Sequence, residues 1–179
     1  MIKKINYEKS NREVGYLYNK IINIKKKDIK GLILNSNYNP NKKSRFCLHK
    51  SKNSKIHEMI IYHKKNYYIK PHKHLGKHES FHLIKGSADV IFFQDNGKID
   101  KIIKMGEYTS SKTYYYRINK AIYHSIVIKS PYIIFHEVVL GPFKKSKTKF
   151  PKWAPKNLKD FKNFIKKNKR YAKKKKIQN

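Results

Sequence analysis

The sequence of 179 residues contains a single cysteine, Cys47. One thiol cannot form a disulfide within the chain, which is typical of proteins from a reducing compartment. No apolar run approaches the roughly 18 residues that a membrane span needs. The residues after Met1 contain no apolar signal segment. These absences predict a soluble, cytoplasmic protein without a membrane span.

Acidic residues and arginine are also scarce. The chain has 11 Asp and Glu against 44 Lys and Arg, which gives a net charge of +33, and only four of the basic residues are Arg. Such a charge can indicate nucleic acid or an anionic membrane as a partner. Here the charge is spread along the chain, and Lys, like the abundant Asn, Ile and Tyr, has A/T-rich codons. Arg, which makes two-pronged contacts with bases, is rare. The composition therefore argues against nucleic acid, and the same charge gives mild support to a small-molecule substrate that carries phosphate, such as a nucleotide sugar.

The middle of the chain, residues 42–155, reads as a series of short apolar runs separated by turn residues. Asp95, Asn96 and Gly97 form a strong hairpin signal, because Asn and Gly tolerate positive φ angles. About eight strands at this spacing predict an all-β protein, a sandwich or jelly-roll barrel. The predicted strands are 56–63, 67–70, 80–84, 88–93, 98–104, 113–118, 122–128 and 132–140.

Shorter segments flank this predicted domain on both sides. Residues 1–41 form an N-terminal extension, with a strand near 14–18 and a short helix that Asp28 caps. Residues 156–179 form a basic tail that is helical in part, with an apolar side at 157–169. Trp153 is expected to pack back on the sandwich.

Residues of metal-binding type lie together in the predicted domain. His72 and His74 are two apart, so on a strand both imidazoles leave the same face. Gly76 makes a bend cheap, and Glu79 can then return a carboxylate to that face. His124 is the candidate for a fourth ligand, although its apolar strand face also suits a core histidine. Two imidazoles and a carboxylate suit one divalent ion, whether iron, manganese, nickel or zinc.

Six further residues are candidates for the reaction or for substrate binding: His49 and His57 for proton transfer, and Arg45, Tyr68, Arg117 and Glu137 for the substrate. The two arginines stand out in a chain whose cations are nearly all lysine. An Arg at a pocket mouth can hold a phosphate or carboxylate with two parallel hydrogen bonds. A salt bridge with Glu58 or Glu137 is the equally simple alternative.

The pattern H-x-H-x4-E-x6-G, which ends at Gly86, resembles the first motif of the cupin superfamily. In more detail the chain resembles the WbuC-type cupin metalloproteins over about residues 42–155. The second motif departs from the family, since P-x-G usually precedes the histidine that corresponds to His124. The segments that carry the resemblance are 45–49, 57–61, 68–74, 79–82, 123–124, 136–137, 141–143 and 153–155.

This resemblance implies a cupin-type β-sandwich, a homodimer, and a metal held by His72, His74, Glu79 and His124. Proteins of the WbuC type are typically encoded with genes for O-antigen and other surface polysaccharides. The first hypothesis is therefore a metal-dependent enzyme that isomerises or epimerises a sugar nucleotide or saccharide intermediate. An iron(II)-dependent oxygenase on the same ligands and a non-catalytic saccharide-binding module are the alternatives.

Overall fold

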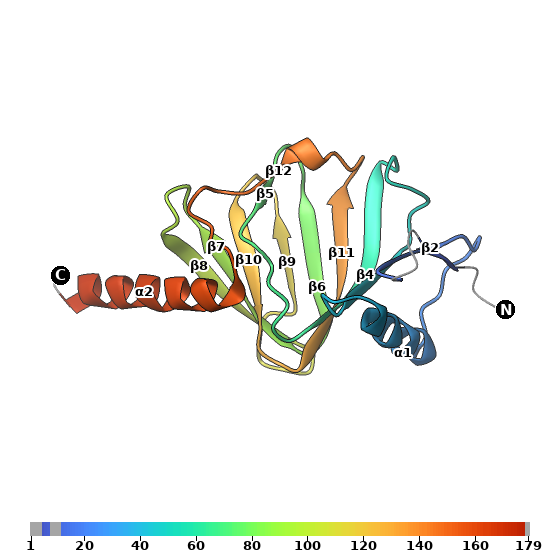
Figure 1. Ribbon diagram of the computed structural model, residues 1–179, viewed down its shortest axis with the longest axis horizontal. Helices are drawn as coiled ribbons and strands as arrows, with labels where there is room; N and C mark the ends of the chain where they lie inside the picture. Colours follow the sequence, from blue (N-terminus) through green and yellow to red (C-terminus); the bar gives the residue numbers. More distant parts are fainter. Residues whose placement is uncertain (1–4, 8–11, 178–179) are drawn as a thin grey trace.

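The computed structural model describes residues 5–7 and 12–177, which form two facing β-sheets with helices at opposite ends (Figure 1). The larger sheet has the strand order β1-β2-β3-β4-β11-β6-β9, and the smaller has the order β10-β7-β8. A third, two-stranded sheet joins β12 to β5. The strands of the larger sheet are β1 (Ile5–Tyr7), β2 (Val14–Leu17), β3 (Lys43–Cys47), β4 (Ile56–Lys64), β6 (Glu79–Lys85), β9 (Tyr115–Ile118) and β11 (Tyr132–Leu140). The remaining elements are β5 (Lys73–His74), β7 (Ser87–Phe93), β8 (Ile99–Gly106), β10 (Tyr123–Ile128), β12 (Thr148–Lys149), α1 (Lys26–Asn35), α2 (Leu158–Ile177) and two short 3-10 turns, Ser36–Tyr38 and Lys145–Lys147.

Apolar side chains fill the space between the two large sheets. Phe81 and Phe135 from the larger sheet stack with ring centroids 4.3 Å apart, and both are almost completely buried. Val90 from the smaller sheet is fully buried in the same cluster. Because successive strand residues point to opposite faces, each strand contributes every second residue to this core. The all-β sandwich expected from the sequence is confirmed.

Two local predictions are wrong. Residues 67–70 form no strand, although Tyr67 and Ile69 do pack against the core. The helix α1 begins at Lys26 with Lys25 as its N-cap, so Asp28 does not occupy the cap position itself. Its carboxylate instead accepts a hydrogen bond from the backbone N–H of Lys25 at 2.6 Å. Asp28 therefore still stabilises the first turn, from a position three residues farther along.

The N-terminal residues extend the larger sheet. β2 pairs with β3 in parallel and β1 pairs with β2 in antiparallel fashion. Helix α1 covers the outer face of β3 and β4 through Leu32, which is fully buried beside Phe46 and Ile60. The predicted division of the chain at residues 41 and 155 stays a prediction.

The C-terminal segment is anchored on the smaller sheet. Phe161 of α2 is fully buried with Ile91 and Phe93. Trp153 stacks on Phe164 with ring centroids 5.6 Å apart. The indole Nε1 donates a hydrogen bond to the carbonyl of Asp95 in the β7–β8 hairpin, at 2.8 Å. The predicted packing of Trp153 on the sandwich is confirmed.

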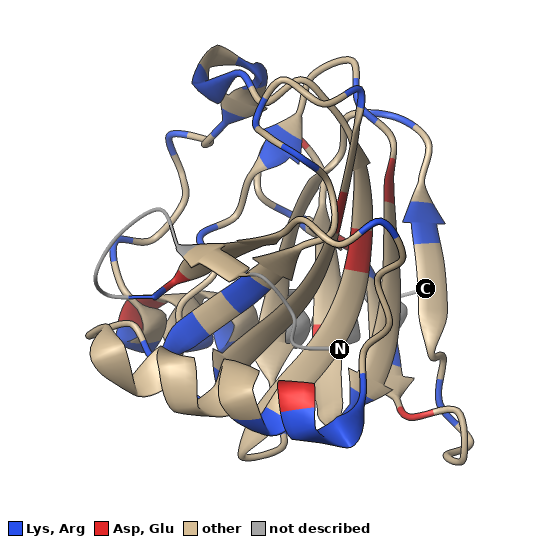
Figure 2. Cartoon of the chain, turned by 90° about the vertical axis from the view of Figure 1, so that its right-hand side faces the viewer, with Lys and Arg blue, Asp and Glu red and all other residues tan. Residues whose placement is uncertain are grey.

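Lysine and arginine are spread over strands, loops and helices rather than gathered on one element (Figure 2). In residues 5–7 and 12–177, no helix has the length and apolar character that crossing a membrane requires.

The contact between Trp153 and the β7–β8 turn provides a test of this anchor. Gly97 has φ +85°, and a Cβ added there would lie 2.9 Å from the indole ring. Gly76 also has a positive φ, +64°, but its added Cβ would meet nothing within 4 Å. We expect Gly76→Ala to lower the free energy of unfolding by about 1–2 kcal/mol through backbone strain alone. We expect Gly97→Ala to cost about 1–3 kcal/mol more, because the indole must also shift. Urea unfolding measures both, and equal losses would contradict the Trp153 anchor.

Candidate metal centre

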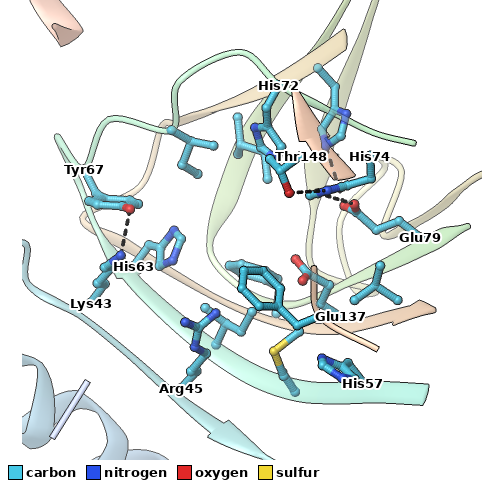
Figure 3. Close-up of a pocket in the computed structure, with 18 of the residues that line it drawn as sticks. Lys43, Arg45, His57, His63, Tyr67, His72, His74, Glu79, Glu137 and Thr148 are labelled. Carbon is cyan, nitrogen blue, oxygen red and sulfur yellow. Dashed lines mark hydrogen bonds and ion pairs between the residues drawn. The ribbon is translucent and has the colours of Figure 1, made fainter. Parts of the chain in front are cut away.

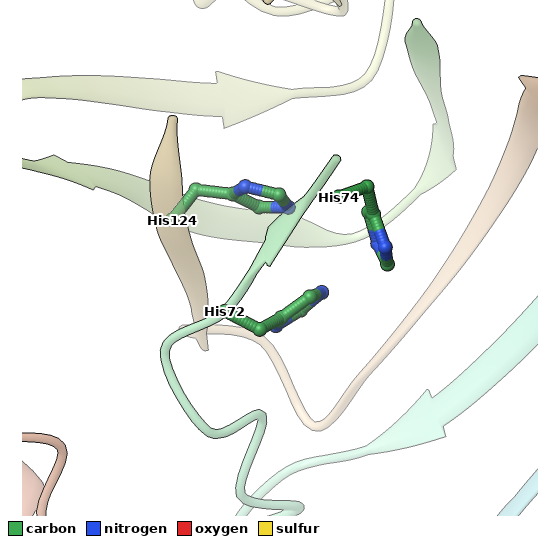
Figure 4. A group of neighbouring side chains, drawn as sticks. All are labelled: His72, His74 and His124. Carbon is green, nitrogen blue, oxygen red and sulfur yellow. The ribbon is translucent and has the colours of Figure 1, made fainter. Parts of the chain in front are cut away.

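Three histidines from two separate segments of the chain lie close together (Figure 4). His72 and His74 lie at β5, and His124 lies on β10. His72 and His124 exchange both backbone hydrogen bonds, at 3.1 and 2.9 Å. Residues paired in this way place their side chains on the same face, and the two ring centroids are accordingly 4.7 Å apart.

The Nδ1 atom of each ring is held by an oxygen. His72 Nδ1 lies 2.8 Å from the Lys70 carbonyl, and His124 Nδ1 lies 3.0 Å from the Ile122 carbonyl. A carbonyl only accepts, so both Nδ1 atoms donate and both Nε2 atoms keep a free lone pair. His74 Nδ1 makes the corresponding contact with the Thr148 hydroxyl at 3.1 Å. Histidines that bind metals are oriented in this way by hydrogen bonds from the other ring nitrogen.

The three candidate ligand atoms of these rings lie within 4.8 Å of one another. The Glu79 carboxylate, which is buried, is 3.5 Å from His74 Nε2 and 3.7 Å from His124 Nε2. Burial and the neighbouring rings lower the pKa of His72 to about 4 and that of His74 to about 3. The imidazoles are therefore neutral at neutral pH, as metal ligands must be.

This donor set fits a divalent cation. Burial raises the pKa of Glu79, because a charged carboxylate is disfavoured away from water. The neighbouring neutral rings contribute no positive charge to balance that carboxylate. A cation among the four side chains would supply the balance, and nitrogen and oxygen donors suit iron, manganese, nickel or zinc. The group can therefore hold a metal ion, whose identity the ligands leave open.

A cavity of about 270 Å³ adjoins the histidines (Figure 3). Its walls include the apolar side chains of Met59, Ile61 and Phe135. The polar side chains on the opposite side from the histidines come from β3, β4 and β11, which are neighbours in the larger sheet. They are Lys43, Arg45, His57, His63 and Glu137.

Glu137 is the second carboxylate of this cavity. Burial and the nearby Glu79 raise its pKa, while the positive charge of Arg45 acts in the opposite direction. A carboxyl group of this kind can take up and return a proton near neutral pH. Apart from Glu79 and Glu137, Glu13 is the only acidic residue in the described part of the chain that lines the cavity.

The two histidines expected to transfer protons lie one behind the other. His57 lines the cavity, and burial lowers its pKa. Its ring stacks on that of His49 with centroids 4.1 Å apart, and its Nε2 donates to the Lys52 carbonyl at 3.1 Å. His49 is not among the residues that line the cavity. The structure therefore places His57 at the cavity wall, and His49 packs behind the His57 ring, away from the cavity.

Of the four predicted substrate-binding residues, the structure brings Arg45 and Glu137 to the cavity but not Tyr68 or Arg117. The Tyr68 hydroxyl donates to the Pro155 carbonyl at 2.6 Å. Arg117 lies opposite Ser80 on the outer face of the sheet, where its Nη1 donates to the Ser80 hydroxyl at 3.1 Å. Strand alternation that turns Glu79 inward necessarily turns Ser80 and its partner outward.

Several polar residues of the cavity were missed by the sequence analysis, among them Lys43, His63 and Thr148. His63 occupies an inward position on β4, and its buried Nδ1 has no hydrogen-bond partner in the described part of the chain. Burial, with the charges of Lys43 and Arg45 beside it, lowers the pKa of His63 to about 3. The inward position of His63 could have been predicted from the sequence, because Met59 and Ile61 lie four and two residues earlier and share its face of the strand.

A family model described as a domain of unknown function, DUF6016, matches residues 24–105, which is less than half of the chain. No curated protein matches the sequence.

Among solved structures, several are similar to part of this chain, at TM-scores below 0.5. The capsular polysaccharide assembling protein CapF from Staphylococcus aureus is 20% identical with a TM-score of 0.48, over 60% of this chain and 31% of that one. A protein from Shewanella oneidensis is 9% identical with a TM-score of 0.49, over 59% and 72%. Oxalate decarboxylase from Bacillus subtilis is 21% identical with a TM-score of 0.44, over 55% and 24%. The chain thus spans about a third of the CapF chain. The WbuC-type assignment stays a prediction.

The Thr148 hydroxyl is expected to tune metal affinity through His74. Thr148→Val keeps the shape of the side chain but removes the oxygen that orients the ring. We expect the dissociation constant for a divalent ion to rise by about 10–100-fold. Thr148→Ser keeps the hydroxyl and should bind as the wild type does. Competition with a coloured chelator measures all three proteins, and equal affinities would show that Thr148 does not orient His74.

Proposed function

We propose that this protein is an enzyme that uses a divalent metal to move a proton on a small oxygen-rich substrate. The observation that carries the proposal is the position of the second carboxylate. Glu137 lines the same cavity as the three histidines, whose Nδ1 atoms are already held. A metal site beside a carboxyl group that can exchange protons is the arrangement that isomerases and epimerases need.

A divalent ion held by His72, His74, His124 and Glu79 would draw electron density from a substrate oxygen and so acidify the adjacent C–H bond. Glu137 would accept that proton and return it to a neighbouring carbon or to the other face. Burial keeps the proton affinity of Glu137 high, so uptake and return are both accessible near neutral pH. His57 is held by Lys52 at the cavity wall, where it positions the substrate or carries a second proton.

The size of the cavity limits the substrate. Ligand pockets commonly have volumes of about 300–1,000 Å³, so a cavity of about 270 Å³ is small. It suits a single sugar ring or an open-chain sugar, and the nucleotide of a sugar nucleotide would lie outside. The assignment of a saccharide, and of surface polysaccharide biosynthesis as its context, rests on the sequence resemblance to WbuC-type cupins.

Metal content tests the first half of the proposal. We expect tag-free protein purified without chelators to contain about one divalent ion per chain, as metal sites of this ligand number hold one ion. His74→Ala should lose that ion, because a ligand is removed from the centre of the group. His78→Ala, an exposed histidine four residues away, should keep it. Mass spectrometry measures the three proteins, and equal, substoichiometric metal in all of them would contradict the proposal.

Glu137→Gln tests the second half. The amide keeps the shape of the side chain but cannot carry the proton, so exchange should slow by about 10²–10⁴-fold while metal content stays unchanged. The measurement is incorporation of solvent deuterium into a panel of nucleotide sugars and free monosaccharides. An unchanged rate would remove Glu137 from the mechanism. Metal-loaded wild type that binds a saccharide but exchanges no deuterium would instead support a binding module.

A further inference from the structure

The wall of the cavity that faces the histidines carries positive charge. On β3, Lys43 and Arg45 occupy alternate positions on the inward face, and Lys43 pairs with His63 across to β4. All three residues line the cavity. In Figure 3, Arg45 and His63 lie together on the far side of the cavity from His72 and His74.

The charge of Lys43 is already compensated. Its Nζ lies 3.0 Å from a carboxylate oxygen of Glu13 and donates to the Tyr67 hydroxyl, also at 3.0 Å. These contacts hold Lys43 and Tyr67 in place as part of the wall. Lys43 therefore forms part of the cavity wall, but its ammonium group is not available to bind a ligand.

Arg45 is different. In the described part of the chain, its guanidinium takes part in no hydrogen bond or ion pair with another side chain, although it stands half-buried on the cavity wall. The neighbouring His63 Nδ1 is buried and likewise has no partner among the described residues. Polar groups in such places are ordinarily satisfied, because leaving them without partners costs free energy. A guanidinium and a buried imidazole Nδ1 that lack hydrogen-bond partners among the described residues, side by side, point to a ligand with acceptor oxygens for the guanidinium.

The nearby carboxylate does not take this role. Glu137 lies close enough to Arg45 for the positive charge to lower its pKa in part, but no hydrogen bond joins the two side chains in the described residues. A guanidinium offers a planar fork of donors that matches the two oxygens of a carboxylate or phosphate. The net positive charge at this end also favours an anion over a neutral hydroxyl.

We infer that Arg45, assisted by His63, forms an oxyanion subsite, and that the substrate carries a carboxylate or phosphate at the end remote from the histidines. This inference rests on the proposed function, and it narrows the substrate to a sugar acid or a sugar phosphate of about one ring. The anion at Arg45 would place the remaining oxygens of the substrate toward His72 and His74, with Glu137 between the two ends.

The chain offers a matched control in Arg117. Substituting it removes the same charge from a protein of net charge +33, yet Arg117 lies on the outer face of the sheet. The probes are inorganic phosphate and, in a separate arm, acetate, titrated calorimetrically into the full-length protein. A constant ionic strength of about 0.15 M suppresses diffuse binding to surface lysines.

We expect one saturable site in the wild type for at least one of the two anions. Arg45→Gln should weaken it by about tenfold or more, since a charge-assisted pair of hydrogen bonds is lost. Arg117→Gln should change it by less than about twofold, because an exposed charge at that distance is screened. Saturation by phosphate alone would identify a phosphorylated substrate, and saturation by acetate alone a carboxylate.

Three results would overturn the inference: no saturable binding of either anion, equal weakening in Arg45→Gln and Arg117→Gln, or unchanged binding in Arg45→Gln. If Arg45→Gln does not fold, Arg45→Lys takes its place, since it keeps the charge but loses the fork. We then expect weakening of about fivefold relative to the wild type, and unchanged binding would again overturn the inference.

Metal content of the same samples separates this inference from the proposed function. Wild type that binds metal but shows no dependence on Arg45 would leave the metal enzyme standing and remove the subsite. Wild type that contains no metal, but whose anion binding depends on Arg45, would leave the subsite standing and remove the metal enzyme. Arg45→Gln itself is expected to keep its metal, because Arg45 is not one of the ligand residues.

Discussion

The two backbone hydrogen bonds that His72 and His124 exchange are the constraint on which the candidate site depends. The segment before His72 forms no strand of its own, so this single bridge fixes it against β10. The Ser125 hydroxyl adds a second attachment by donating to the Ile69 carbonyl. Because the exchange of both bonds places the two imidazoles on one face, the spacing of His72 and His74 then delivers the third ring to the same centre.

The larger sheet serves both as a wall of the core and as a wall of the site. Along β11, Phe135 completes the apolar core and Glu137, two residues farther on, reaches the cavity. Two of the 11 acidic residues, Glu79 and Glu137, are thus held in surroundings that disfavour their charge. Burying a carboxylate costs several kcal/mol unless a positive charge or hydrogen bonds compensate it. A metal ion at Glu79 would supply that compensation for the first carboxylate, while the charge of Arg45 offsets only part of the cost at Glu137, whose pKa stays raised.

Most of the sandwich was predictable from the sequence, because its core strands are short apolar runs and turn residues separate one run from the next. The strand predicted at residues 67–70 was wrong. Tyr67 and Ile69 alternate because both pack against the core, but the backbone there pairs with no neighbouring strand. Strand β3 was not predicted, for the opposite reason. The inward positions of β3 carry Lys43 and Arg45, which face the cavity instead of the core, so the strand lacks an apolar pattern. Hydrophobic periodicity identifies strands only where they line a core.

The candidate site was predictable only in part, for a related reason. The spacing of His72, His74 and Glu79 is local, and strand geometry alone indicated a shared face. Thr148, by contrast, meets His74 from 74 residues away, and no pattern near Thr148 marks it. Arg45 and Arg117 looked equivalent as rare arginines, and only the register of their strands separates cavity from solvent.

The contact between Thr148 and His74 also links the site to the C-terminal anchor. After β11 the chain crosses to pair β12 with β5, which places Thr148 on His74, and it then descends to Trp153. If the segment from Thr148 to Trp153 were fixed at one end only, holding Thr148 against His74 would require its residues to be ordered. Ordering each residue costs about 1–2 kcal/mol. The packing of Trp153 and Phe161 on the smaller sheet fixes the second end. The anchor therefore lowers the entropic cost of holding His74 in the orientation that leaves its Nε2 free. In this way apolar packing on the smaller sheet supports a neighbouring polar site, since Trp153 also contacts Tyr123, the residue before His124.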